Sequence, residues 1–380
     1  MGTTCPRRWE RIVTSAAVAR THAPSLLPSA EPLGLLRLDG SIDSGSELSM
    51  PSDEVLSTLH RRIVLGRRFD AQATALTKQG RLAVYPSARG QEAGEIGAVM
   101  ALREQDWLFP TYRDSMAVVA RGVDPVEVLT LLRGDWHCGY DPYEHRVGPQ
   151  CTPLATNALH AVGLAHAAKV KGEDTVALVM LGDGATSEGD THEALNFAAV
   201  WKSPVVFFVQ NNGYAISVPL AKQTAAPSLA HKGIGYGIPS MLIDGNDVAA
   251  VYAAVNKAVA AAAAGGGPTL IEAITYRIEA HTNADDATRY RDRAEVEFWL
   301  QRDPLDRIRR HLVDRGLLDD QAIAEIDAAA EAEAATLRER MNVDTQLDPN
   351  DLFRHVYAEQ TETLRRQAAD LAAELALSKE

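Results

Sequence analysis

Cysteine is scarce in this 380-residue sequence: three occur, Cys5, Cys138 and Cys151, and no two of them form a CxxC pair. The chain therefore carries neither a disulfide framework nor a cysteine-ligated zinc motif. A reducing cytoplasm is the location that this cysteine usage favours. Residues 1–20 contain four arginines and one acidic residue, a composition that transit peptides share with other N-terminal tails, so an organelle matrix stays an open alternative.

Positive charge and long apolar runs are also lacking. Lys and Arg total 38 against 51 Asp and Glu, a formal net charge of −13, and without a basic stripe we expect no nucleic-acid partner. No apolar run approaches the roughly 20 residues that a membrane span needs, so no membrane association is expected. The sequence has no GK[ST] and no GxGxxG motif, which excludes a P-loop and disfavours a dinucleotide-binding fold.

Strand-like and helix-like patterns alternate in the middle of the chain. Buried strands are predicted at residues 107–110, 175–181, 204–210 and 269–276, and a further strand–helix unit begins at residue 241. Helices are predicted at residues 92–102, 187–201 and 248–264. Because continuous apolar strands that alternate with helices indicate a parallel sheet covered on both faces, we expect an α/β fold.

The rest of the chain has a different character. Residues 1–45 are poor in regular pattern and rich in Ser, Pro and Thr, and we expect a disordered tail before an α/β domain at residues 46–320. Residues 134–151 lack periodicity and are predicted to form a long functional loop. Residues 321–380 are predicted to form a helical C-terminal region, with an Ala/Glu-rich helix at 321–340 and an amphipathic helix near 350–376.

Two of the predicted strands end in polar turns. One is followed by Gly182-Asp183-Gly184, and the next by Asn211-Asn212-Gly213-Tyr214. The carboxyl ends of neighbouring parallel strands open on one crevice, so we expect Asp183 and Asn212 to meet there if the strands form one βαβ unit. A carboxylate, an amide oxygen and a main-chain carbonyl are ligands that suit magnesium together with phosphate oxygens. The pattern predicts a magnesium–diphosphate site.

The stretch from Gly182 to Ser217 is similar to the thiamine-diphosphate motif in the alpha subunits of 2-oxo acid dehydrogenase decarboxylase components. The likeness runs from about Arg68 through Tyr357 and resembles most the branched-chain 2-oxo acid and bacterial pyruvate branches. It implies a thiamine-diphosphate-binding fold, with a parallel central sheet, helices on both faces and a helical C-terminal extension. It also implies that Asp183, Asn212 and the main-chain carbonyl of Tyr214 bind Mg²⁺.

The same resemblance assigns further contacts with thiamine diphosphate. Tyr112 and Arg113 match the clamp on the diphosphate, a role that suits the planar guanidinium fork of arginine. Residues 151–157 match the loop at the aminopyrimidine end, where Leu154 helps hold the cofactor bent. His281 matches a catalytic histidine beside the diphosphate and the reacting carbon. The implied cofactor-binding residues are Tyr112, Arg113, Thr152, Leu154, Asp183, Gly184, Ala185, Asn212 and His281.

Some positions depart from the family pattern. Gln210 stands where some branched-chain relatives carry a diphosphate-binding arginine, so that contact is expected to be lost. Cys151 and Asn157 replace typical oxygen ligands of a potassium ion in mammalian relatives, which argues against potassium here. Arg277 and Asp285 flank His281 in the sequence, and we expect the two side chains to pair and hold the loop after it.

The resemblance implies oxidative decarboxylation of a 2-oxo acid, with a branched-chain substrate favoured and pyruvate next. The acyl group would pass to the lipoyl group of an acyltransferase component. In the family, the glutamate that activates the aminopyrimidine belongs to a separate beta subunit, so an α2β2 assembly is expected. Three alternatives stay open: an acetoin dehydrogenase alpha subunit, an NAD-linked oxidoreductase and a non-catalytic assembly subunit.

Overall fold

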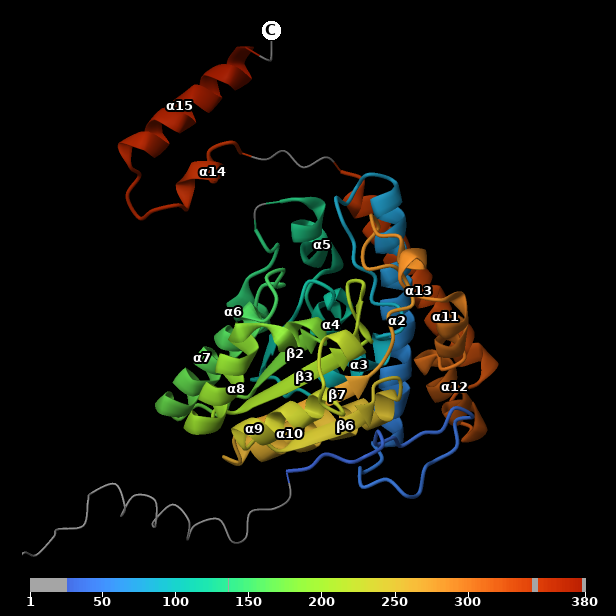
Figure 1. The fold of residues 1–380 in the computed structure, drawn as a ribbon. Helices are drawn as coiled ribbons and strands as arrows, with labels where there is room; N and C mark the ends of the chain where they lie inside the picture. The colour runs from blue at the N-terminus through green and yellow to red at the C-terminus, as the bar shows by residue number, and fades with distance from the viewer. Residues whose placement is uncertain (1–25, 136, 344–347, 378–380) are drawn as a thin grey trace, which may run out of the picture.

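The computed structural model describes residues 26–135, 137–343 and 348–377, and a five-stranded sheet lies at its centre (Figure 1). All neighbouring strands in it run parallel, which confirms the predicted α/β class. In spatial order the strands are β1 (Trp107–Phe109), β2 (Ala177–Gly182), β3 (Val205–Asn211), β7 (Thr269–Ile274) and β6 (Ser240–Asp244). A separate antiparallel pair joins β4 (Tyr214–Ala215) to β5 (Val218–Pro219).

Helices cover both faces of the sheet because the strands are apolar on both sides. Phe207 and Val209 of β3 pack with α7 (Thr156–Lys171) and α8 (Gly189–Trp201) in one core. Val206 and Phe208 point the other way, into a larger core. That core contains α2 (Asp53–Lys78), α3 (Glu92–Met100), α4 (Ser115–Ala120), α5 (Pro125–Arg133) and α10 (Val248–Ala263). The period-two alternation of β3 therefore divides the interior into two layers.

The connection between β2 and β3 positions the polar turns. Helix α8 links the two strands as the crossover of a parallel βαβ unit, as predicted. Their register pairs Gly182 with Gln210, so both strands finish at the same edge of the sheet. Asp183 and Asn212 follow directly on these ends and leave the sheet side by side.

The described part of the predicted tail is packed. The main-chain N–H groups of Leu35 and Leu36 donate to Asp247 Oδ2 at 2.7 and 2.6 Å, and both leucines are buried. Leu33 forms a bridge to Ile243 of β6. The expectation of a disordered tail is therefore wrong for residues 26–45, because partners more than 200 residues away hold the segment. The rest of that tail, and the targeting alternative for it, lie outside the described residues.

The C-terminal region also differs from the prediction. The Ala/Glu-rich segment is α13 (Asp320–Met341), which packs along α2 and places Leu337 in the main core. Two helices replace the single one predicted near 350–376: α14 (Asp351–Arg354) and α15 (Glu362–Leu377). The second begins where Thr361 Oγ1 accepts a hydrogen bond from the N–H of Leu364, a capping contact that starts a new helix.

The other elements are short or peripheral. The predicted 134–151 loop contains one helical turn, α6 (Pro142–His145). The remaining helices are η1 (Gly184–Ser187), η2 (Leu220–Lys222), η3 (Leu229–His231), α9 (Lys232–Tyr236), η4 (Ala287–Arg289), α11 (Arg293–Leu300) and α12 (Pro304–Asp314). Within the described ranges, none of the helices combines the length and apolar character that crossing a membrane requires.

The two-layer core predicts unequal costs for two truncations. Phe207→Ala should lower the free energy of unfolding by about 3–5 kcal/mol, because Phe207 is fully buried at the centre of the sheet. Val170→Ala should change it by less than about 0.5 kcal/mol, because Val170 is 74% exposed on α7. Urea unfolding of the purified variants measures both values, and similar losses in the two would contradict the layer assignment.

Candidate active site

A cavity of about 230 Å³ lies at the carboxyl ends of β2 and β3. Nine of the ten residues predicted for the site line it: Tyr112, Arg113, Leu154, Asp183, Gly184, Ala185, Asn212, Tyr214 and His281. Thr152 is the exception; it is exposed, and its neighbours Cys151 and Pro153 form that part of the wall. Segments far apart in the sequence therefore meet at the predicted edge of the sheet.

Oxygen ligands line the cavity where the two strands end. Asp183 is buried and its Oδ2 accepts a hydrogen bond from Gln223 Nε2 at 2.6 Å. Burial raises the pKa of the Asp183 carboxyl group, and a cation beside it would stabilise its charged form. Asn212 Oδ1 accepts from the N–H of Tyr214 at 3.1 Å. One carboxylate, one amide oxygen and the nearby main-chain carbonyl can serve a hard cation.

The two polar turns touch one another through small residues. A Cβ atom on Gly184 would lie 2.7 Å from the Cβ of Ala215, on the strand that begins with Tyr214. That separation is far below van der Waals contact, so the third residue of the Gly-Asp-Gly turn has to be glycine in this packing. Gly184 thereby lets the turn after β2 approach the hairpin after β3.

Two arginines face His281. Arg113 Nη2 lies 3.1 Å from His281 Nδ1, and Arg277 Nη1 lies 3.4 Å from the same atom. Burial, followed by these two guanidinium groups, lowers the pKa of His281 to about 4. Since both neighbours are donors, Nδ1 must be the acceptor nitrogen, and the ring proton is on Nε2.

The two arginines are held by neutral groups rather than by direct ion pairs. Neither Arg113 nor Arg277 belongs to an ion pair within the part of the chain that the structure describes. Arg277 Nε is moreover buried and has no hydrogen-bond partner. Buried arginine without an acidic partner is costly, and an anion in the cavity would offset that cost. The site is therefore suited to phosphate or carboxylate groups.

The predicted direct pairing of Arg277 with Asp285 is wrong. The hydroxyl group of Tyr290 stands between the two side chains: Arg277 Nη2 donates to it at 2.9 Å, and it donates to Asp285 Oδ2 at 2.5 Å. Asp285 Oδ2 also accepts from the main-chain N–H of His281 at 2.9 Å. The loop after His281 is held as expected, through an aromatic hydroxyl that sequence spacing did not indicate.

Several residues of the site were missed at the sequence level. Gln91 precedes α3 and Gln223 follows η2, and neither stands in a motif that marked it, yet both contact predicted site residues. Ile216 has a φ of 56°, an unusual value for a β-branched residue. The main-chain oxygen of Ile216 accepts from Arg277 Nη2 at 2.8 Å, which helps hold this strained conformation against the cavity.

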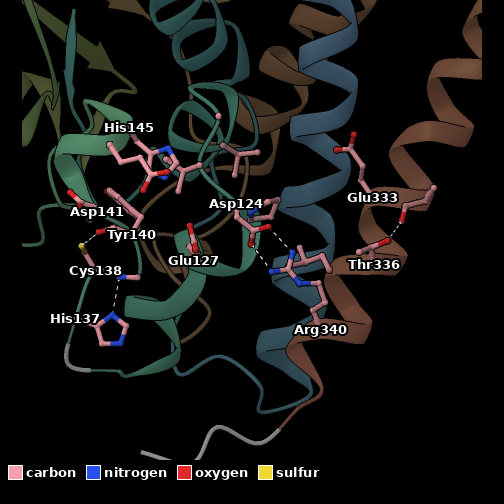
Figure 2. A pocket seen from close by; sticks show the side chains of 18 residues that line it. Asp124, Glu127, His137, Cys138, Tyr140, Asp141, His145, Glu333, Thr336 and Arg340 are labelled. Atoms are coloured by element: carbon pink, nitrogen blue, oxygen red, sulfur yellow. Dashed lines mark hydrogen bonds and ion pairs between the residues drawn. The ribbon is translucent and has the colours of Figure 1, made fainter. Parts of the chain in front are cut away.

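A larger hollow of about 920 Å³ lies between α5, the 137–145 loop and α13 (Figure 2). It shares no lining residue with the cavity at the strand ends. Arg340 and Asp124 on its rim neutralise each other across 2.6 Å, and Cys138 Sγ contacts the main-chain oxygen of Tyr140 (Figure 2). The hollow beside α13 is the larger of the two, but the buried arginines and the buried carboxylate lie around the cavity at the strand ends. We therefore assign the candidate active site to the cavity at the strand ends.

Comparison with known proteins identifies the family of this chain. Residues 60–348 match the family model described as "Dehydrogenase E1 component". The chain is 47% identical over 348 residues to a 3-methyl-2-oxobutanoate dehydrogenase subunit alpha of Mycobacterium tuberculosis, covering 91% of this chain and 95% of the relative. It is 39% identical over 319 residues to a pyruvate dehydrogenase E1 component subunit alpha of Staphylococcus aureus, covering 83% and 86%. The chain belongs to the dehydrogenase E1 component family.

Proposed function

We propose that this chain is the alpha subunit of a thiamine-diphosphate-dependent 2-oxo acid dehydrogenase that transfers the acyl group to a lipoyl group. A branched-chain 2-oxo acid is the favoured substrate, since the relative with that activity has the higher identity and coverage, and pyruvate is second. The observation that carries the proposal is the cavity in which Asp183, Asn212, Arg113 and His281 meet. The family match argues against an NAD-linked oxidoreductase.

The residues of the cavity fit a metal-bound diphosphate. The unpaired Arg113 and the buried, partnerless Nε of Arg277 offer donors to phosphate oxygens. Asp183, Asn212 and the carbonyl of Tyr214 would hold Mg²⁺, which prefers oxygen ligands. In the described residues, no cluster of three or more His, Cys, Asp or Glu side chains could hold a metal.

When bound, thiamine diphosphate supplies a thiazolium ring that accepts the electron pair released as carbon dioxide departs. The chain's own residues bind and orient the reactants. Arg113 would hold the diphosphate, while Leu154 and Ile216 provide apolar walls in the cavity. Asp183 would hold the metal that neutralises part of the diphosphate charge. The protein's contribution is therefore positioning and electrostatics.

His281 would act as a neutral hydrogen-bond donor. Its Nδ1 faces two guanidinium groups, so the proton is held at Nε2 and the imidazole stays uncharged near neutral pH. A neutral donor can bind the carboxylate of a 2-oxo acid or the acyl oxygen without adding a third positive charge. We assign to His281 the positioning of substrate and the assistance of acyl transfer.

The proposal includes partner proteins. Large apolar side chains are exposed on neighbouring α7 and α8, namely Val170, Phe197, Val200 and Trp201. Such a surface is typical of a protein interface, and a beta subunit would complete an α2β2 enzyme with closed symmetry. A lipoyl-bearing acyltransferase component is the second partner.

Cys138 and Cys151 are free thiols, which supports a cytoplasmic location.

Asp183→Asn should remove the carboxylate that binds the metal. We expect the affinity for thiamine diphosphate in the presence of Mg²⁺ to fall at least about tenfold, since even the outer partners of metal ligands typically contribute about 10–100-fold. Titration calorimetry on the complex with the beta subunit measures it. Asp190→Asn is the matched control, because Asp190 lies in the first turn of α8 and does not line the cavity. Equal affinities in both variants would refute the metal assignment.

The neutral state of His281 predicts a pH effect on stability. The unfolded histidine titrates near pH 6.5, whereas folded His281 stays neutral down to about pH 4. Between these values the unfolded state binds more protons, so stability falls as pH drops. His281→Asn should lose less free energy of unfolding than the unmodified chain between pH 6.5 and 4.5, measured by urea unfolding. Identical pH dependence in the two proteins would count against the neutral assignment.

Activity should require the partner. The isolated chain should not decarboxylate 2-oxo acids at any concentration of thiamine diphosphate and Mg²⁺, because the carboxylate that activates the aminopyrimidine is expected on the beta subunit. Adding the beta subunit should restore decarboxylation, with 3-methyl-2-oxobutanoate preferred over pyruvate in kcat/KM. Robust turnover by the isolated chain would overturn the two-chain proposal, and a preference for pyruvate would overturn the substrate choice.

A further inference from the structure

A line of buried amides runs from the candidate metal ligand Asn212 into the core. Asn212 Nδ2 donates to Gln91 Oε1 at 3.0 Å, and Gln91 Nε2 donates to Gln210 Oε1 at 3.2 Å. Gln210 Nε2 then donates to Asp114 Oδ1 at 2.6 Å. All four side chains are at most 6% exposed, so solvent offers them no alternative partners. We call Asp114, Gln210 and Gln91 the amide relay.

The direction of this relay is set at its inner end. Asp114 Oδ2 accepts from the main-chain N–H and the hydroxyl group of Thr111, both at 2.7 Å. The carboxylate can only accept, so Gln210 has to present its NH₂ group to Asp114 and its oxygen to Gln91. The same logic turns the oxygen of Gln91 toward Asn212. Asn212 therefore donates from its NH₂ group to Gln91. This leaves Oδ1 as the side-chain atom of Asn212 that can face a cation.

We infer that the amide relay positions the metal ligand: Asp114, acting through Gln210 and Gln91, fixes which atom of the Asn212 amide is available to the cation. This rests on the proposed function and names positioning residues for it. It also gives a role to Gln210, which stands where some branched-chain relatives carry a diphosphate-binding arginine. An amide in the wrong orientation would offer NH₂ to a cation, so the relay prevents a ligand that repels the metal.

The first test reverses the inner end of the relay. In Asp114→Asn, the new oxygen is claimed by the main-chain N–H of Thr111, so the new NH₂ group faces Gln210. Either a mismatch of two donors or two acceptors then appears along the relay, or all three amides turn over and Asn212 presents its NH₂ group to the cation. We expect the Mg²⁺ affinity, measured by titration calorimetry of the α2β2 protein with saturating thiamine diphosphate, to fall about 10–100-fold, as for other outer partners of metal ligands.

The second substitution should restore what the first removes. In the double variant Asp114→Asn with Gln210→Glu, the glutamate accepts from the new amide and also from Gln91 Nε2. The direction beyond Gln91 is thereby the original one, so most of the Mg²⁺ affinity should return. A residue that acts only through packing would not be rescued in this way. A matched control is Asp247→Asn, a fully buried aspartate outside the relay, which should lower the melting temperature and leave Mg²⁺ affinity unchanged.

A third pair of variants covers the case in which Asp114→Asn does not fold. Gln91→Glu keeps an acceptor opposite Asn212, although its second oxygen faces Gln210 Oε1 without a proton to donate. It should hold the Mg²⁺ affinity above that of Gln91→Leu, which offers Asn212 no acceptor at all. The inference is overturned if Gln91→Glu and Gln91→Leu bind Mg²⁺ equally, or if folded Asp114→Asn is unaffected or is not rescued by Gln210→Glu. Failure of the unmodified protein to bind Mg²⁺ with thiamine diphosphate would instead overturn the proposed function. Asn212 would then not be a metal ligand, and the relay would have none to position.

Discussion

The parallel register of β2 with β3 is the constraint on which the rest of the site depends. It pairs Gly182 with Gln210 and so brings the two polar turns to one edge of the sheet. The strands hold this register because they are buried on both faces between two layers of helices. A shift by one residue would exchange the layers that Phe207 and Phe208 fill. The packing of the core thus determines where Asp183 and Asn212 stand.

The charged side chains around the cavity determine which kind of ligand it suits. Two arginines without direct ion pairs and one buried carboxylate stand around it, and burial disfavours each of these charges. A ligand that carries both phosphate and a divalent cation satisfies both signs of charge together. Under the proposed function, a single protein carboxylate would then suffice for Mg²⁺, while burial and the two arginines keep His281 neutral.

Much of this arrangement could be predicted from the sequence because its signals are local. The Gly182-Asp183-Gly184 and Asn211-Asn212 turns end apolar runs, and a single helix separates the two strands. Gln91 and Tyr290 carried no such signal, since each acts on partners that only the fold brings near. The packing of residues 26–45 could not be predicted from the sequence for the same reason. Asp247, which holds this segment, lies about two-thirds of the way along the chain.

The contact between Gly184 and Ala215 has a consequence for how this protein can change over time. Because a Cβ on residue 184 would overlap the Cβ of residue 215, the two turns form one mechanical unit although they lie on different strands. A side chain could appear at 184 only in a background where 215 had already become glycine. Residues 184 and 215 are therefore expected to change together during evolution. A side chain at 184 that one relative tolerates would be harmful if it were introduced alone into this protein.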